Sequence, residues 1–165
     1  MKLFVILKPF HILLIWITLL FAWIFTFNSP LYYLTFGLAY TSAIGWVYLV
    51  GKIFNGLNNK TRIENYREDF WFILTFISFI PNIYFFKHTD IQVDLRNVLL
   101  IIFNSINCLG LFKTLNFATK SYRQFETGLN LTFIKYFMYF LMFCYFFIAV
   151  FFVQPKINRI FKLNK

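Results

Sequence analysis

Long apolar runs, separated by short polar intervals, dominate the pattern of residues along this chain. A helix needs about 17–25 mainly apolar residues to cross a bilayer, and the runs reach that length. Most charged residues fall in the intervals, which is typical of lipid-facing helices. The pattern predicts an all-α fold, a polytopic transmembrane helix bundle in a single membrane domain over residues 1–165. We expect five spans, over residues 9–27, 31–50, 70–86, 97–118 and 131–153.

Turn-forming residues and prolines mark the breaks between these runs. Asn28, Ser29 and Pro30 end the first run, because proline cannot continue the preceding helix and Asn and Ser favour turns. The third run has 17 residues without a charge, close to the lower length limit, and its Pro81 predicts a kink. If this third run were re-entrant, the bundle would have four spans.

The last 15 residues, 151–165, read FFVQPKINRIFKLNK. An apolar and aromatic run ends there, and basic residues follow it. Proline suits the first turn of a helix, so Pro155 predicts a new helix over residues 155–164. On a helical wheel Ile157, Ile160 and Phe161 share one side. The other side holds Lys156, Arg159, Lys162 and Lys165. We expect a short interfacial helix whose apolar edge enters the acyl boundary of the lipid and whose basic residues contact anionic lipid headgroups.

Composition agrees with a membrane location. Apolar residues make up 60% of the 165 residues, against about 45–50% in ordinary globular domains, and the mean hydropathy is +0.66. The formal charge of +10 belongs to no soluble module that could present it to a nucleic acid. We therefore expect no nucleic acid partner and a bilayer with anionic headgroups instead. The apolar stretch after Met1 is too long for a cleaved signal and is interpreted as the first span.

The distribution of Lys and Arg predicts the orientation, because cytoplasmic loops carry the excess of these residues. With five spans, the side of the N-terminus receives ten of them and the other side six. A re-entrant third segment would change the counts to twelve and four and would place both termini inside. We predict a cytoplasmic N-terminus, and the side of the C-terminus stays open.

A row of small residues in the second span is a candidate packing site. Gly37, Thr41 and Gly45 recur at intervals of four, and such a row lets another backbone approach closely. We expect it to pack against the first helix. A contact with another membrane protein subunit is the alternative.

Polar residues inside the fourth span are a second candidate site. Asn104, Ser105 and Asn107 form a strip that either hydrogen-bonds between helices or lines a polar path for a substrate. Lys113 and Lys135 lie within reach of the hydrocarbon, and both can extend to the same interface, where a pairing with Glu126 is one alternative.

The sequence shows no pattern of catalytic, cofactor-binding or metal-binding residues. The carboxylates fall in loops or at span ends, whereas ion-coupled carriers use an ionisable group at the midplane. Motifs for an activated nucleophile, a zinc protease or a phosphate loop are missing. Cys108 and Cys144 lie in apolar runs without further ligands nearby. His88, Asp90 and Asp94 share a short loop, which favours solvated side chains over a metal site. We expect no cofactor and no enzymatic activity.

The runs IGWVYLVGKIFNGLNNK, FIPNIYFF and VFFVQPKINRIF resemble segments of small multi-pass inner-membrane proteins of Bacteroidota-type bacteria that carry no assigned function. This resemblance implies a bacterial inner membrane and brings no catalytic residue with it. The residues themselves favour a non-enzymatic integral membrane protein, an accessory or scaffold component. The alternative is a small channel or transporter that uses the polar strip of the fourth span.

Overall fold

The computed structural model describes residues 8–26, 31–58, 66–87, 93–127 and 133–163, and within these ranges every regular element is an α-helix. The helices are α2 (Pro9–Phe25), α3 (Leu31–Asn58), α4 (Tyr66–Lys87), α5 (Val93–Thr127), α6 (Phe133–Cys144) and α7 (Phe146–Leu163). The predicted all-α class is thereby confirmed. The first four of these helices follow the first four apolar runs, although α3 and α5 extend well beyond them.

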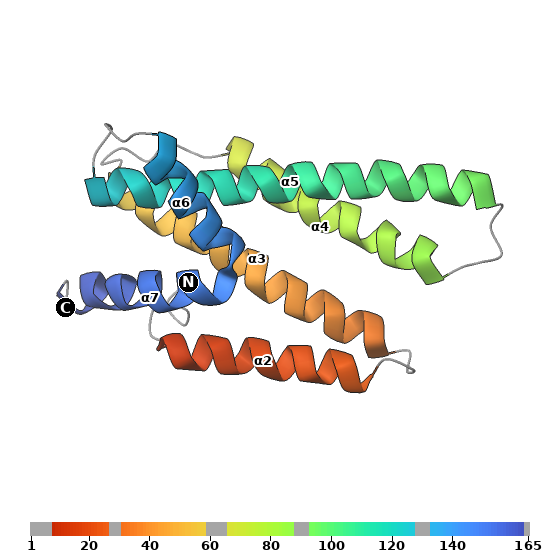
Figure 1. Ribbon diagram of the computed structural model, residues 1–165, viewed down its shortest axis with the longest axis horizontal. Coiled ribbons are helices and arrows are strands. Elements are labelled where there is room, and N and C mark those ends of the chain that lie inside the picture. Colours follow the sequence, from red (N-terminus) through yellow and green to blue (C-terminus); the bar gives the residue numbers. More distant parts are fainter. Residues whose placement is uncertain (1–7, 27–30, 59–65, 88–92, 128–132, 164–165) are drawn as a thin grey trace.

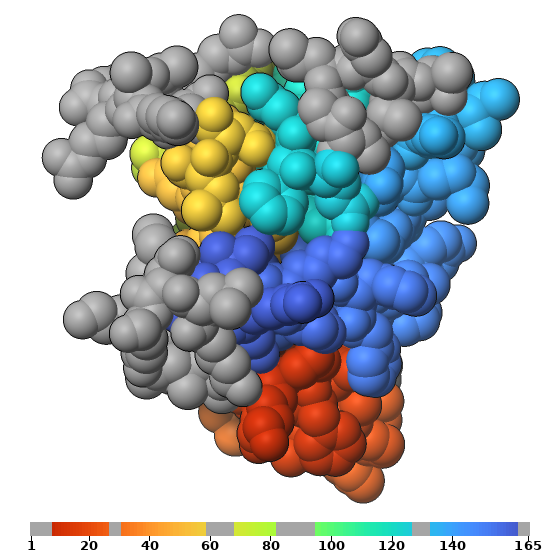
Figure 2. Space-filling view, turned by 90° about the vertical axis from the view of Figure 1, so that its left-hand side faces the viewer, coloured from red at the N-terminus to blue at the C-terminus, as the bar shows by residue number. Residues whose placement is uncertain are grey.

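Helix α5 forms the centre of the bundle, where it contacts α3, α4 and α6, while α2 packs on α3 and α7 (Figure 1). Its 35 residues correspond to about 52 Å at 1.5 Å per residue, more than the hydrocarbon thickness of about 30 Å. Figure 1 shows that α3, α5 and α7 all finish at the same end of the bundle, where α2 and α4 begin. We call this the basic end, because Lys52, Lys120 and Arg159 lie within the last two turns of α3, α5 and α7. Viewed from this end, α3 and α5 lie side by side above α7, with α2 below (Figure 2).

Two described helices are long and apolar enough to cross a membrane, Leu31–Asn58 and Leu95–Glu126. Helices α6 and α7 would supply a third span if they formed one, although they are bent by 104° relative to each other. Helix α2 is apolar but has only 17 residues. These helices indicate a membrane protein with two or three apolar segments of spanning length, a coarser result than the predicted five spans.

The C-terminal region departs from the predicted continuous span over residues 131–153. The chain bends by 104° at Tyr145. The backbone hydrogen bonds end and restart there: the Tyr145 N–H donates to the Leu141 carbonyl at 3.0 Å, and the Ile148 N–H donates to the Tyr145 carbonyl at 2.8 Å. One apolar run therefore forms two helices, and we call α6, Tyr145 and α7 together the C-terminal hairpin.

The separate helix predicted from Pro155 is instead the second half of α7, which continues through the proline. Val153, Gln154 and Ile157 are each exposed by 1% or less, so the protein core holds the helix on both sides of Pro155. This packing also corrects the predicted role of the apolar edge. Ile157 packs into the protein core and not into the lipid.

The core lies where α2, α3, α5 and the C-terminal hairpin meet. Its largest buried side chains include Trp46, Phe54, Tyr122 and Phe143. The rings of Phe54 and Tyr122 are 5.0 Å apart in an edge-to-face arrangement, which is a favourable geometry for aromatic pairs. Phe54 and Tyr122 lie beyond the predicted ends of their spans, at residues 50 and 118. Their contact stabilises the helical extensions of α3 and α5 against each other.

Candidate functional site

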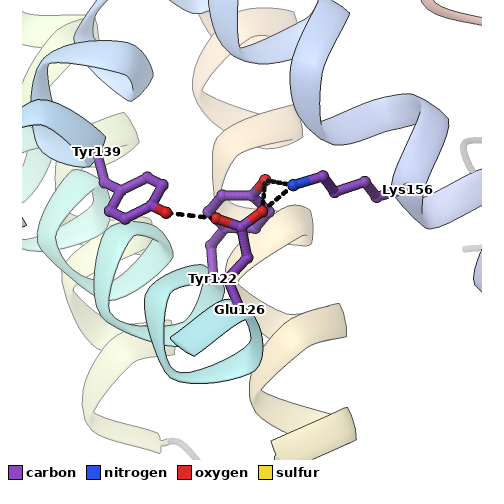
Figure 3. Close-up of polar contacts among 4 residues, drawn as sticks. All are labelled: Tyr122, Glu126, Tyr139 and Lys156. Atoms are coloured by element: carbon purple, nitrogen blue, oxygen red, sulfur yellow. Dashed lines mark hydrogen bonds and ion pairs between the residues drawn. The ribbon is translucent and has the colours of Figure 1, made fainter. Parts of the chain in front are cut away.

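A carboxylate with three donors joins α5, α6 and α7 at the basic end (Figure 3). The Tyr122 hydroxyl donates to Glu126 Oε1 at 2.8 Å, and the Tyr139 hydroxyl donates to Glu126 Oε2 at 2.6 Å. Lys156 Nζ donates to Glu126 Oε1 and, at 2.8 Å, to the Tyr122 hydroxyl. We call Tyr122, Glu126, Tyr139 and Lys156 the carboxylate cluster.

Each member of the carboxylate cluster is placed by a different part of the packing. Tyr122 and Glu126 are four residues apart on α5, so they lie on one helix face. The Tyr122 and Tyr139 rings are 5.6 Å apart in an edge-to-face contact, which brings α6 against α5. Lys156 Nζ lies 5.2 Å from the centre of the Tyr122 ring, which adds a cation–π contact from α7.

The surroundings of Glu126 suit a structural role. The Glu126 side chain is only 17% exposed, whereas that of Lys156 is 47% exposed. Buried carboxylates are stable when they are paired and hydrogen-bonded, and here both oxygens accept bonds. With its lone pairs engaged by three donors, Glu126 holds the C-terminal hairpin against α5.

The carboxylate cluster changes the interpretation of the basic C-terminal residues. Lys156 was predicted to contact lipid headgroups, but it pairs with Glu126 because Ile157 is drawn into the core and turns Lys156 toward α5. Arg159 is exposed, as headgroup contact requires. The side chain of Lys162 and all of Lys165 lie outside the described residues.

The other lysines considered as partners of Glu126 lie elsewhere. Lys113 Nζ is placed over the ring of Trp71 in α4, 5.7 Å from its centre. Lys135 is exposed on α6. Glu126 itself belongs to α5 and not to a loop.

A buried hydrogen bond joins α3 to α7. Trp46 Nε1 donates to Gln154 Oε1 at 3.0 Å, and Gln154 Nε2 donates to Asn158 Oδ1 at 3.1 Å. Gln154 is 1% exposed and Trp46 is 2% exposed. A glutamine inside an apolar run is thus accommodated by a tryptophan 108 positions earlier.

An ion pair joins α3 to the start of α4. Lys52 Nζ lies 2.9 Å from Asp69 Oδ1, and the Tyr48 hydroxyl also donates to Asp69. Burial alone would raise the pKa of Asp69, but the hydrogen bonds from Tyr48 and Lys52 and the Lys52 charge hold that pKa below its usual value. Asp69 lies in the first turn of α4, before the apolar part of that helix.

The structure separates the three residues of the predicted polar strip. Asn107 donates to the Thr75 carbonyl of α4 at 2.8 Å and accepts from the Tyr40 hydroxyl of α3 at 2.8 Å. Asn104 and Ser105 are exposed on the outside of α5, and the Ser105 hydroxyl donates to the Ile101 carbonyl of its own helix. Of the three described side chains, only Asn107 bonds to other helices.

The predicted small-residue row does not pack against α2. A Cβ added to Gly37 would lie 3.7 Å from Phe79 of α4, and one added to Gly45 would meet nothing within 4 Å. Thr41 is exposed. The row therefore divides between a contact with α4 and an open surface. Other side chains hold α2 against α3, such as Trp23 and Phe36, whose rings are 5.0 Å apart.

Close backbone approach occurs at two other glycines. A Cβ on Gly51 would lie 2.7 Å from the Phe117 ring and 3.1 Å from Ala118 Cα of α5. A Cβ on Gly110 would lie 3.1 Å from the Trp71 carbonyl oxygen of α4. These glycines let α5 pack tightly on α3 and α4.

A cavity of about 350 Å³ opens beside the bend of the C-terminal hairpin. Its lining is contributed by five helices and is mainly apolar: Trp16, Tyr40, Ala43, Ile44, Val47, Leu111, Thr114, Leu115, Phe143, Cys144 and Phe146. Within the described ranges, no three His, Cys, Asp or Glu side chains are placed to hold a metal ion. His88 and Asp90 lie outside these ranges, and the side chain of Asp94 is not described.

Sequence reasoning missed Tyr122, Tyr139, Trp46 and Gln154. Tyr and Trp are abundant in this chain, so no single aromatic position stands out. Gln154 could have indicated the contact between α3 and α7, because it is a polar residue within an otherwise apolar run. Glu126 gave a second signal, since it is four residues from Tyr122 and therefore shares its helix face.

The chain matches no family of proteins, and we find no significantly similar curated protein or solved structure. Its function must therefore be argued from its own residues.

Proposed function

We propose that this protein is a non-enzymatic integral membrane protein that serves as an accessory or scaffold component of the bacterial inner membrane. The observation that supports this proposal is the use of its polar side chains. Asn107, Glu126 and Gln154 bond across helices and stabilise the bundle. The cavity at the bend has a mainly apolar lining, which suits neither an ion path nor acid–base chemistry.

We further propose four membrane crossings, by α2 to α5, followed by the C-terminal hairpin as a re-entrant element. Helix α6 has 12 residues, a length more typical of re-entrant or interfacial segments than of spans. After the bend, α7 returns toward the basic end, where α5 also finishes (Figure 1). Both termini then lie on the same side of the membrane.

The distribution of charge supports this topology. With the C-terminal hairpin re-entrant, fourteen of the sixteen Lys and Arg residues fall on the side of the termini, and only Lys87 and Arg96 fall on the other. The positive-inside rule then favours the cytoplasm for both termini far more strongly than the ten-to-six distribution of a five-span chain.

An open face on α3 is where we propose that a partner helix packs. Leu34, Leu38, Thr41 and Gly45 fall within one narrow face at helical spacing, and the first three are exposed. Nothing lies within 4 Å of a Cβ placed on Gly45. Small residues on such a face allow a neighbouring transmembrane helix to approach closely.

Solute flux separates the scaffold from the alternative channel or transporter. The full chain, reconstituted into sealed phospholipid vesicles, should leave the permeability to ions and small polar solutes at the level of empty vesicles. The double variant N104L/N107L should lose membrane abundance through its missing Asn107 bonds, without a change in flux. Flux above the empty-vesicle level that this double variant abolishes at normal abundance would overturn the proposal.

Partner packing is tested by sizing complexes extracted from the membrane in mild detergent. Replacing Gly45 by Ile should shift the protein from a larger complex to the size of the single chain while its abundance stays normal. Leu57→Ile is the matched control on the same helix, since Leu57 is 40% exposed and lies outside this face. Single-chain size for the wild-type protein would contradict the partner contact.

A further inference from the structure

The cavity at the bend of the C-terminal hairpin offers few hydrogen bonds to a guest, because its lining is mainly apolar. Among its lining residues, the Tyr40 hydroxyl already donates to Asn107, and the Thr114 hydroxyl donates to the Gly110 carbonyl at 3.0 Å. The remaining lining consists of Trp, Ala, Ile, Val, Leu, Phe and Cys side chains. Apolar cavities of this kind stay dry, because a water molecule needs two to four polar partners.

The size and position of the cavity suit a hydrocarbon chain. Its volume of about 350 Å³ falls within the range of about 300–1,000 Å³ that is usual for ligand sites. Cys144 belongs to the lining and is exposed, so the cavity reaches the protein surface beside the bend. In a membrane protein, the apolar material next to such an opening is the acyl chain region of the bilayer.

An exposed track leads from the bend to the basic end of α7. Phe152 and Arg159 are seven residues apart on α7, which keeps them on one helix face, and Tyr145 lies at the bend that precedes the helix. All three are exposed. The 14 residues from Tyr145 to Arg159 correspond to about 21 Å, which is half of the 40–45 Å thickness of a bilayer with its headgroups. If Tyr145 lies near the midplane, Arg159 lies at the level of the headgroups.

We propose that the C-terminal hairpin binds one anionic phospholipid, with the end of an acyl chain in the cavity and the headgroup phosphate at Arg159. The apolar lining selects the chain, and the guanidinium selects a negatively charged headgroup through charge-assisted hydrogen bonds. The bound lipid fills the space that the 104° bend leaves between α3, α5 and the C-terminal hairpin. This lipid site is independent of the partner helix proposed for α3.

Photo-cross-linking tests the position of the chain. The full-length protein is reconstituted in vesicles of phosphatidylethanolamine and phosphatidylglycerol that contain phosphatidylglycerol with a diazirine at the end of one acyl chain. After illumination, peptides that carry Ala43, Leu111 or Cys144 should be labelled in preference to outward-facing positions such as Ile101, which is 66% exposed. Labelling that is even over all lipid-facing positions would overturn the proposal.

Two variants fill the cavity from different sides. Ala43→Phe fills it from α3, and Cys144→Trp closes its opening, so each should lower the labelling of cavity peptides by about tenfold. Leu57→Phe is the matched control on α3, because Leu57 is 40% exposed and lies outside both the lining and the proposed partner face. If Ala43→Phe fails to fold, Cys144→Trp at the surface still decides the outcome. Unchanged labelling in a folded cavity variant would contradict the chain site.

The headgroup is tested with matched probes. Phosphatidylglycerol carrying the diazirine should label the cavity about tenfold more than phosphatidylcholine carrying it, and Arg159→Gln should remove this preference. Equal labelling by the two probes in the wild-type protein would overturn the assignment of an anionic lipid. Stronger labelling by a diazirine-bearing polyprenyl lipid than by phosphatidylglycerol would overturn the assignment of a phospholipid.

Discussion

Single polar side chains contribute to the choice of which helices stay together in this protein, because lipid offers no hydrophobic drive for helix association. Trp46 and Gln154 join α3 to α7, and Asn107 joins α5 to both α3 and α4. Each of these groups would be unpaired if its helix moved away. An unpaired buried polar group costs about 1–3 kcal/mol, so these contacts favour one arrangement of the helices over others.

Replacing Gln154 by Leu should lower the free energy of unfolding by about 1–3 kcal/mol, because the buried Trp46 N–H loses its acceptor. The double variant W46F/Q154L should lose less than the sum of the two single changes, since both partners are then removed together. Denaturation by SDS in mixed micelles measures these free energies. Phe152→Leu, on an exposed face of α7, is the control. Additive single effects would mean that the two side chains do not interact.

The sequence was least informative about which individual polar residues face other helices. The strip of Asn104, Ser105 and Asn107 was visible as polar residues in an apolar run, but all three looked alike. Helix rotation decides that Asn107 faces α3 and α4 while its two neighbours in the strip face outward. The rotation of α5 about its own axis depends on contacts with segments that are distant in the sequence. The residues of the fourth span alone therefore could not predict it.

Among the helices, the C-terminal hairpin differs most from its sequence pattern. The residues around Tyr145 are uninterrupted apolar and aromatic side chains, and sharp bends usually need Pro, Gly or Ser. Pro155, the residue expected to start a helix, lies inside α7 instead. The bend is stabilised from outside the hairpin, by the packing of Phe143, Phe146 and Val150 in the core and by the carboxylate cluster. Local sequence could therefore predict helices here but not their bend.

Disrupting the carboxylate cluster should loosen α7. Glu126→Gln removes the charge that holds Lys156 and weakens the acceptor shared by two tyrosines, with an expected loss of about 1–3 kcal/mol. Hydrogen–deuterium exchange of the amides in α7 should then accelerate, while exchange in α4, which packs on α3 and α5, stays unchanged. Lys120→Gln, at an exposed position of the same helix, should leave both rates as they are. Unchanged exchange in the Glu126 variant would show that the cluster does not hold the hairpin.

Glycine substitutions test the contacts between long helices. Gly51→Ala should destabilise the protein by about 1–3 kcal/mol, because the new methyl group would meet the Phe117 ring and the Ala118 backbone. Gly45→Ala, on the same helix, meets nothing within 4 Å and should be neutral or stabilising by up to about 1 kcal/mol. The same SDS titration compares the two variants. Equal effects at both positions would contradict the close approach of α3 and α5.

The apolar runs predicted the all-α class and the positions of α2 to α5. Such predictions succeed because the length of an apolar run and the turn residues that follow it largely determine where a helix begins and ends. The runs could not predict that α3 and α5 continue to Asn58 and Thr127. Residues such as Asn58 and Ser121 look solvated in sequence, yet Asn58 donates to the Ser121 carbonyl at 2.8 Å across the helix contact. The folded ends of α3 and α5 provide the surface on which the C-terminal hairpin packs.

The orientation that we propose for the whole chain rests on that packing. A straight fifth span would carry Lys156, Arg159, Lys162 and Lys165 to the side opposite the N-terminus, whereas the re-entrant hairpin keeps them on the same side. The second arrangement leaves only Lys87 and Arg96 on the far side, in agreement with the positive-inside rule. The two arrangements differ in the side of the membrane on which the C-terminus lies.

The side of the C-terminus is therefore the most direct test. Green fluorescent protein and alkaline phosphatase are fused in turn after Lys165 of the full chain, and the same pair inserted between α4 and α5 serves as the reference for the far side. We predict a fluorescent C-terminal fusion and an inactive phosphatase there, with the opposite pattern at the reference position. An active phosphatase and a dark fluorescent protein after Lys165 would mean that the C-terminal hairpin crosses the membrane, and would contradict the account.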